Sequence, residues 1–263
     1  MTTTKPGIGF YKVPDGETTI NTVKWAIEAG YRHFDCASFY KNEYSVGNAL
    51  KESGIPRNSI TITSKIWNDE QGYDNTLKAF ERSLQRLQTD YLDYYLIHWP
   101  IKRHMQETWQ ALEELHQSGK VKAIGVSNFY VQHLEYLLSF AHIMPAIDQV
   151  ELHPYLQQKE LIAFCRQHNI SVEAWSPLMR GHIKEEEVIR EIARNHGKSP
   201  AQITIRWHLQ KGLRVIPKSI HQERIHENMD VLNFELTQQE LAKIDQLDCN
   251  RHFGTAPDKF YNL

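Results

Sequence analysis

Short apolar runs alternate along the chain with segments in which apolar residues recur every three or four positions. The runs are rich in Val, Ile, Tyr and Phe, which favours buried strands, whereas the longer spacing predicts amphipathic helices. The predicted strands lie near residues 7–11, 31–35, 59–64, 91–97, 121–126, 146–150, 170–175 and 213–217. Strands that alternate with helices are typical of parallel βα units. The pattern therefore predicts an α/β fold, a single (β/α)8 TIM barrel over residues 1–263.

Two of the predicted helices keep their apolar residues on one face, from Leu77 to Leu87 and from Met105 to Leu115. These faces should pack against the barrel. Gly30, Gly54 and Gly119 each follow a helical pattern, at a place where a left-handed cap favours glycine.

The later connections are also predicted by local signals. Residues 184–210 should hold two helices, because Ser199-Pro200 provides a cap and a first-turn proline. Lys102 to Met105 is expected to be a brief link, and Leu178 to Glu185 a short loop. No linker or low-complexity tract divides the chain, so we expect one domain.

Composition narrows the class of partner. Thirty basic and thirty-two acidic residues give a formal charge of -2, without the basic excess that nucleic-acid binding requires. No apolar stretch reaches the ~20 residues of a membrane helix. Cys36, Cys165 and Cys249 are far apart in the sequence, which fits a reducing compartment. We therefore expect a cytoplasmic protein that binds neither nucleic acid nor membrane. We also expect a monomer, although no residue pattern determines the oligomeric state.

Several common motifs are absent. Gly7-Ile8-Gly9 continues without the glycine of a Rossmann phosphate turn. Gly197-Lys198-Ser199 lacks the preceding glycine of a P-loop, because that position is Ile192. The fourteen histidines include no His-Glu-x-x-His pair, so no metal site is expected.

Four side chains that can move or orient a proton follow predicted strands, namely Asp35, Tyr40, Lys65 and His98. In a parallel barrel the active site is built at the carboxyl ends of the strands, so these positions can meet in one pocket. Each alone also has a structural explanation: a helix cap, an aromatic staple, a solvated strand end and a core histidine.

Their sequence contexts favour catalysis. Phe34 to Tyr40, Thr63 to Trp67 and Leu96 to Pro100 resemble, in order, the active-site segments of the aldo-keto reductase superfamily. The resemblance continues through five later motifs, at 125–129, 149–154, 174–178, 216–219 and 224–228. It is nearest to short bacterial members of the 2,5-diketo-gluconate reductase type, and it covers nearly the whole chain.

The resemblance implies reduction of a carbonyl, in which Tyr40 donates the proton as charge grows on the substrate oxygen. The ammonium of Lys65 would favour the tyrosinate and lower the pKa of Tyr40 below its ordinary ~10. Asp35 would hold Lys65 charged, and His98 would orient the substrate.

The family binds NADPH over the barrel mouth. By resemblance, Ser127, Asn128 and Gln149 bind the carboxamide, and Trp175 stacks on the nicotinamide ring. The segment Ser176, Pro177 and Leu178 follows, with Leu178 near the pyrophosphate.

The resemblance also implies a site for the 2′-phosphate at Lys218, Ser219 and Arg224. Two cations and a hydroxyl suit a phosphate dianion, so we expect NADPH to be preferred over NADH. Glu227 and Asn228 match positions near the adenine. The alternative for the cluster is solvated charge beside a loop.

The expected substrate is a small-molecule carbonyl compound. Residues that match substrate positions of the family are Tyr11, Trp67, His98, Trp99 and Asn128. Phe253 is a further candidate for the aromatic wall. Aromatic walls suit aldehydes and also sugar rings, so we expect an open pocket for small aldehydes, dicarbonyls and ketosugars.

Two other functions compete with the reductase. The first is a redox-sensing regulatory subunit that keeps the cofactor site. The second is an unrelated phosphate-binding isomerase barrel, which would require the ordered motifs to be coincidental.

Overall fold

The computed structural model describes residues 5–263, so the first four residues of the predicted domain lie outside the described part. All its strands are parallel and follow one another in sheet order from β1 to β8. The strands are β1 (Ile8–Gly9), β2 (His33–Asp35), β3 (Thr61–Ile66), β4 (Leu92–Ile97), β5 (Val121–Ser127), β6 (Ile147–Glu151), β7 (Ser171–Trp175) and β8 (Arg214–Val215).

Two backbone hydrogen bonds join the first strand to the last. The amide of Gly7 donates to the carbonyl oxygen of Val215 at 2.9 Å, and the amide of Gly9 donates to that of Pro217 at 3.1 Å. The sheet therefore closes on itself, and the predicted TIM barrel is confirmed.

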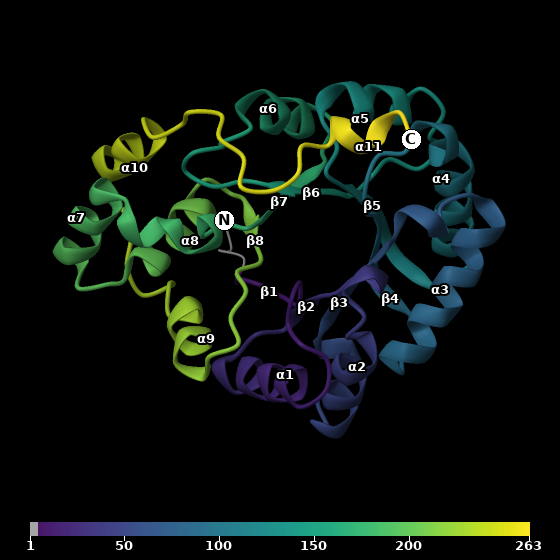
Figure 1. The fold of residues 1–263 in the computed structure, drawn as a ribbon, viewed down its shortest axis with the longest axis horizontal. Helices are drawn as coiled ribbons and strands as arrows, with labels where there is room; N and C mark the ends of the chain where they lie inside the picture. The colour runs from purple at the N-terminus through teal and green to yellow at the C-terminus, as the bar shows by residue number, and fades with distance from the viewer. Residues whose placement is uncertain (1–4) are drawn as a thin grey trace.

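Helices surround the strands on the outside of the barrel (Figure 1). They are α1 (Glu17–Ala29), α2 (Glu43–Glu52), α3 (Tyr73–Leu87), α4 (Lys102–Gln117), α5 (Val131–Leu138), α6 (Lys159–Gln167), α7 (Glu187–His196), α8 (Pro200–Gln210), α9 (Gln222–Met229), α10 (Gln238–Asp245) and α11 (Asp258–Tyr261). The predicted faces are buried, with Phe80 and Leu84 on α3 and Met105 and Trp109 on α4. Each such side chain stabilises the fold by about 1.5–3 kcal/mol.

The predicted stops and starts of the helices agree with the structure. Gly30, Gly54 and Gly119 have φ angles of 96°, 68° and 76°, a left-handed conformation that glycine adopts without strain. Ser199 caps α8, and its Oγ accepts a hydrogen bond from the amide of Gln202. No helix among residues 5–263 is long and apolar enough to cross a membrane.

Some boundaries differ from the predictions. Lys102 to Met105 is the first turn of α4 rather than a link, because the buried face of that helix already begins at Met105. Strand β1 has only two residues, since the chain turns at Lys12, where φ is 57°. Strand β8 is equally short, and Pro217 lacks the amide that would extend its ladder.

Candidate active site

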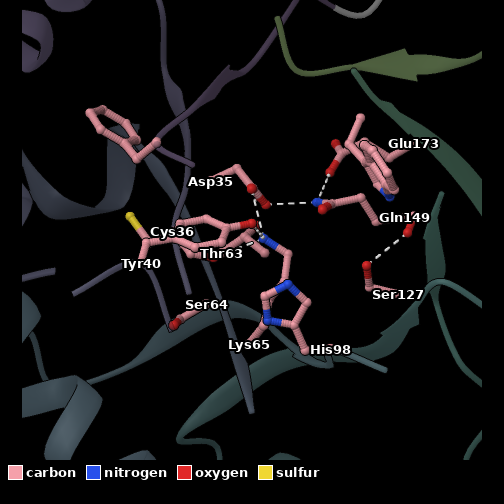
Figure 2. A network of polar contacts seen from close by, with 12 residues as sticks. Asp35, Cys36, Tyr40, Thr63, Ser64, Lys65, His98, Ser127, Gln149 and Glu173 are labelled. Carbon is pink, nitrogen blue, oxygen red and sulfur yellow. Dashed lines mark hydrogen bonds and ion pairs between the residues drawn. The ribbon is translucent and has the colours of Figure 1, made fainter. Parts of the chain in front are cut away.

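A buried ammonium contacts two side chains and one main-chain carbonyl at the carboxyl ends of β2 and β3 (Figure 2). Nζ of Lys65 donates to Oδ1 of Asp35 at 2.7 Å and to the carbonyl oxygen of Cys36 at 2.8 Å. It also donates to the hydroxyl oxygen of Tyr40 at 3.4 Å. Asp35 ends β2, and Tyr40 ends the short 3-10 helix η1 (Ser38–Tyr40) that follows. Residues from two neighbouring βα units thus form one hydrogen-bonded group.

Burial and pairing together determine the charges in this group. Burial raises the pKa of Asp35, and the ammonium of Lys65 opposes that shift. Burial alone would lower the pKa of Lys65, but Asp35 and Tyr40 raise it above its usual value, so the ammonium stays charged. For Tyr40, burial raises the pKa more than Lys65 lowers it. The predicted fall in the pKa of Tyr40 is therefore wrong, and its phenol keeps its proton at neutral pH.

His98 follows β4 directly and faces the same group. Its ring meets that of Tyr40 edge-on, with the centroids 5.7 Å apart. Burial, together with the charge of Lys65, holds the pKa of His98 well below its usual value, so the ring is neutral. Its Nδ1 is buried and makes no hydrogen bond with residues 5–263. A neutral imidazole has one N–H that it can donate to a ligand.

These side chains can protonate an oxygen atom that is gaining negative charge. The phenol of Tyr40 has a proton to give, and the ammonium of Lys65 stabilises the phenolate left behind. The neutral ring of His98 can donate a hydrogen bond to the same oxygen. Negative charge grows on a carbonyl oxygen when hydride adds to its carbon, so the arrangement suits carbonyl reduction.

Gln149, at the middle of β6, lies beside the carboxylate of this group. Its Nε2 donates to Oδ2 of Asp35 at 2.7 Å and to Oε2 of Glu173 at 2.8 Å. The hydroxyl of Ser127 donates to the main-chain oxygen of Gln149 at 2.8 Å. The structure therefore brings the predicted carboxamide-binding residues next to the predicted proton-transfer residues.

Asn128 connects Trp175 to the segment that carries His98. Its Nδ2 donates to the main-chain oxygen of His98 at 2.9 Å, and its Oδ1 accepts from Nε1 of Trp175 at 2.8 Å. The backbone of Asn128 is left-handed, with φ at 64°, which asparagine adopts more readily than most residues. Gly254 packs so closely on the indole that an added Cβ would lie 2.4 Å from it. The orientation of Trp175 is therefore held from two sides.

An exposed pair of cations lies after β8, as the phosphate prediction requires. Lys218 and Ser219 follow the strand, and Arg224 lies on α9. Neither Lys218 nor Arg224 forms an ion pair with residues 5–263. Partial burial and the nearby charge of Lys12 lower the pKa of Lys218. Positive charge without a protein counterion suits a phosphate dianion, which Arg224 can bind with two hydrogen bonds.

The remaining predicted cofactor residues lie on two segments. Ser176, Pro177 and Leu178 follow β7 directly, and the backbone of Ser176 is left-handed with φ at 53°. Glu227 and Asn228 lie on the last turn of α9, where Glu227 accepts a hydrogen bond from the hydroxyl of Ser199.

Aromatic side chains gather around the phenol and the imidazole. The ring centroids of Tyr11 and Tyr40 are 5.2 Å apart, and those of Trp67 and His98 are 5.0 Å apart. Trp99 is nearly buried and stacks on His98 at 6.3 Å. These predicted substrate residues therefore surround the proton-transfer group.

Two other aromatic residues differ from the prediction. Phe39 was not predicted to line the site, but its ring stacks on Trp67 at 3.7 Å and is 40% exposed. Its place one residue before Tyr40 is a signal that the sequence contains. Phe253, by contrast, finds its aromatic partners at His153, Tyr155 and His182.

Sequence reasoning also missed two charged residues inside the barrel. Glu173 on β7 is buried, and its Oε1 accepts from Nε of Arg214 on β8 at 3.0 Å. A charged residue between apolar neighbours in a predicted strand could have indicated them. Glu173, Asp35 and His33 are close enough together to hold a metal ion, but the two carboxylates already pair with Arg214 and Lys65.

Known proteins resemble the chain over nearly its full length. The glyoxal reductase of Bacillus subtilis is 53% identical over 253 residues, which are 96% of this chain and 92% of that protein. The 9,11-endoperoxide prostaglandin H2 reductase of Trypanosoma cruzi is 50% identical, covering 97% and 91% of the two chains. A Gox0644 mutant solved in complex with NADPH has a TM-score of 0.92 at 44% identity, covering 97% and 93%.

None of these three proteins is named as a regulatory subunit or an isomerase. The profile of the Aldo/keto reductase family matches residues 7–249. The ordered motifs, the closed barrel and these similarities agree, and the chain belongs to the aldo/keto reductase family.

Proposed function

We propose that this aldo/keto reductase, which reduces carbonyl groups at the expense of NADPH, acts on small aldehydes and dicarbonyls, with Tyr40 as the proton donor. The observation that carries this proposal is the contact of Lys65 with both Asp35 and Tyr40 at the mouth of the barrel. The hydrogen-bonded group contains the phenol proton of Tyr40, with the buried positive charge of Lys65 beside it.

Each residue of the group has a separate task in the reduction. NADPH, when bound, supplies the hydride. Tyr40 gives its proton to the substrate oxygen, and Lys65 stabilises the resulting phenolate. Asp35 keeps Lys65 charged. His98 donates a hydrogen bond that orients the oxygen toward Tyr40.

The cofactor residues fit the same reaction. Gln149 and Asn128 lie where they can bind a carboxamide, and Trp175 offers an indole platform to the ring. Lys218 and Arg224 provide the positive charge that favours the 2′-phosphate of NADPH. We therefore expect a strong preference for NADPH over NADH.

Small carbonyl compounds are the proposed substrates because Tyr11, Phe39 and Trp67 form an aromatic wall that is partly exposed. Such a wall packs against flat or compact ligands without selecting one polar pattern. The glyoxal reductase of B. subtilis supports a dicarbonyl. The prostaglandin reductase of T. cruzi, at similar identity, indicates that a larger substrate is also compatible with the family.

One spectrophotometric panel tests this proposal. The loss of NADPH and of NADH is followed with phenylglyoxal, methylglyoxal, nitrobenzaldehyde and 2,5-diketo-gluconate. We expect turnover of several compounds, fastest with the dicarbonyls and with NADPH. A single substrate favoured a thousandfold over the rest would contradict the open pocket, and tight NADPH binding without any turnover would contradict the activity itself.

Two further expectations, on the oligomeric state and on the location in the cell, stay predictions. A monomer is expected from the sequence and can be checked by size-exclusion chromatography with light scattering. A cytoplasmic location is expected from the free thiols of Cys36, Cys165 and Cys249, and fractionation of the source cells would test it.

A further inference from the structure

A row of buried polar side chains continues from Asp35 across the interior of the barrel (Figure 2). Oε2 of Glu173 accepts from Nε2 of Gln149 at 2.8 Å, and its Oε1 accepts from Nε of Arg214 at 3.0 Å. Arg214 also donates to the hydroxyl oxygen of Tyr94 at 2.8 Å. Neither Glu173 nor Arg214 has a part in the reaction described above.

Two carboxylates determine how the amide of Gln149 is turned. Nε2 carries two hydrogens, and it donates to Asp35 at 2.7 Å and to Glu173 at 2.8 Å. The reversed amide would point its carbonyl oxygen at two carboxylates, which repel it. Both side-chain hydrogen bonds of Gln149 within residues 5–263 use Nε2, and none uses Oε1. That oxygen is therefore left to accept a hydrogen bond from a ligand.

Arg214 keeps Glu173 in the form that can only accept hydrogen bonds. Burial alone would raise the pKa of Glu173, but the charge of Arg214 and the hydrogen bonds from Gln149 and Arg214 lower it. His33 adds no charge at pH 7, because burial lowers its pKa to about 4. Lys65 and Arg214 thus balance the charges of Asp35 and Glu173 inside the barrel. Each carboxylate therefore has a cation beside it, and both accept a hydrogen bond from the same amide.

We infer that Glu173, held by Arg214, is a positioning residue that orients Gln149 so that its Oε1 can accept a hydrogen bond from the nicotinamide carboxamide. The inference rests on the proposed function, in which Gln149 binds that carboxamide. Glu173 touches neither the reacting atoms nor Tyr40. Its loss should weaken cofactor binding through Gln149 and leave proton donation intact.

The test is a double-mutant cycle on the full-length protein. In Glu173→Gln the new amide faces donors from both Arg214 and Gln149 with only one acceptor. The charged guanidinium of Arg214 makes the stronger hydrogen bond to that oxygen, so the bond to Gln149 is lost. We expect the Kd for NADPH, measured by fluorescence titration, to rise about tenfold. The kcat at saturating NADPH and the KM for methylglyoxal should change less than about twofold, a split that general loosening of the barrel would not produce.

The double variant Glu173→Gln/Gln149→Ala should bind NADPH with the same Kd as Gln149→Ala alone, within about twofold. Glu173 acts on the cofactor through Gln149, so its substitution has no further effect once Gln149 is gone. Asp93→Asn is the matched control. Asp93 is a buried carboxylate on β4, and its partners within residues 5–263 are Arg57, Lys122 and the amide of Ile62 rather than Gln149. It should not change the Kd.

Several results would overturn the inference. They are an equal rise in Kd with and without Gln149, no rise in folded Glu173→Gln, or an equal rise in the Asp93→Asn control. If Gln149→Ala alone leaves the Kd unchanged, the proposed contact of Gln149 with the cofactor fails, and the inference fails with it. Should Glu173→Gln not fold, Glu173→Asp keeps the charge but is one methylene shorter, and the same cycle and the same outcomes apply to it.

Discussion

Two buried carboxylates pair with cations at opposite ends of the barrel strands. Asp35 is the last residue of β2 and pairs with Lys65, whose side chain is fully buried. Asp93 is the second residue of β4 and pairs with Arg57, whose side chain is 25% exposed. The first pair lies at the mouth of the barrel and the second at its floor.

The two pairs differ in what else they touch. At the floor, Asp93 also accepts from Lys122 at 2.9 Å and from the amide of Ile62 at 2.9 Å, so its oxygens are occupied by fixed donors. At the mouth, Lys65 reaches the hydroxyl of Tyr40, a group that can lose its proton. In the proposed function, the contact with Tyr40 gives the pair at the mouth a chemical role, whereas the pair at the floor is structural.

The largest difference in stability and turnover is expected between two variants, one that breaks the pair at the mouth and one that breaks the pair at the floor. Lys65→Met leaves Asp35 buried without its cation, which should lower the free energy of unfolding by about 3–5 kcal/mol. It also removes the charge that stabilises the phenolate, so carbonyl reduction should fall at least ~100-fold. Asp93→Asn should cost about 2 kcal/mol of stability and change kcat less than about twofold.

Urea unfolding and steady-state kinetics on the two variants measure both quantities. If Lys65→Met retains more than a tenth of wild-type turnover, the claim that the pair at the mouth takes part in the reaction is contradicted. An equal loss of turnover in folded Asp93→Asn would contradict it as well.

The second prediction separates binding of the cofactor phosphate from proton transfer at the mouth of the barrel. Replacing both cations, with Lys218→Gly and Arg224→Ala, should lower the ratio of kcat/KM for NADPH over NADH about 100-fold, because two charge-assisted bonds to phosphate are lost. The kcat with saturating NADH should stay near its wild-type value. An unchanged preference for NADPH would mean that these charges are only solvated.

The smallest effect concerns pH. The pKa of His98 is held well below its usual value, so the ring takes up a proton only far below pH 6.5. The pKa of Tyr40 is raised, so its proton is lost only on the strongly alkaline side. The kcat for reduction should therefore change less than about twofold between pH 6 and pH 8. An acid limb near pH 6.5 would show that His98 titrates in that range.

The strand pattern was predictable because burial on both faces of parallel strands leaves apolar runs in the sequence, such as the four residues Tyr94 to Ile97 of β4. The first and last strands were predicted at the right places but too long, because their closure depends on backbone bonds of Gly7 and Gly9 rather than on a side-chain pattern. The start of α4 at Lys102 was missed because its first three residues are polar and its buried face begins only at Met105.

At the candidate site, the resemblance indicated which residues to consider but not the shifts of their pKa values. The pKa of Tyr40 rises because burial outweighs the ammonium, and burial depends on packing that the sequence does not state. Glu173 and Arg214 are single charges in apolar runs, and their pairing depends on the register between β7 and β8. A charged residue within an apolar strand run is therefore a signal that it pairs with another charged residue inside the barrel.

The most direct test of the central claim is single-turnover reduction of methylglyoxal by Tyr40→Phe with NADPH already bound. The substitution removes one hydroxyl, so the Kd for NADPH should stay within about twofold while the rate of the chemical step falls ~100-fold or more. A rate above a tenth of wild type, with NADPH bound normally, would contradict the assignment of Tyr40 as the proton donor.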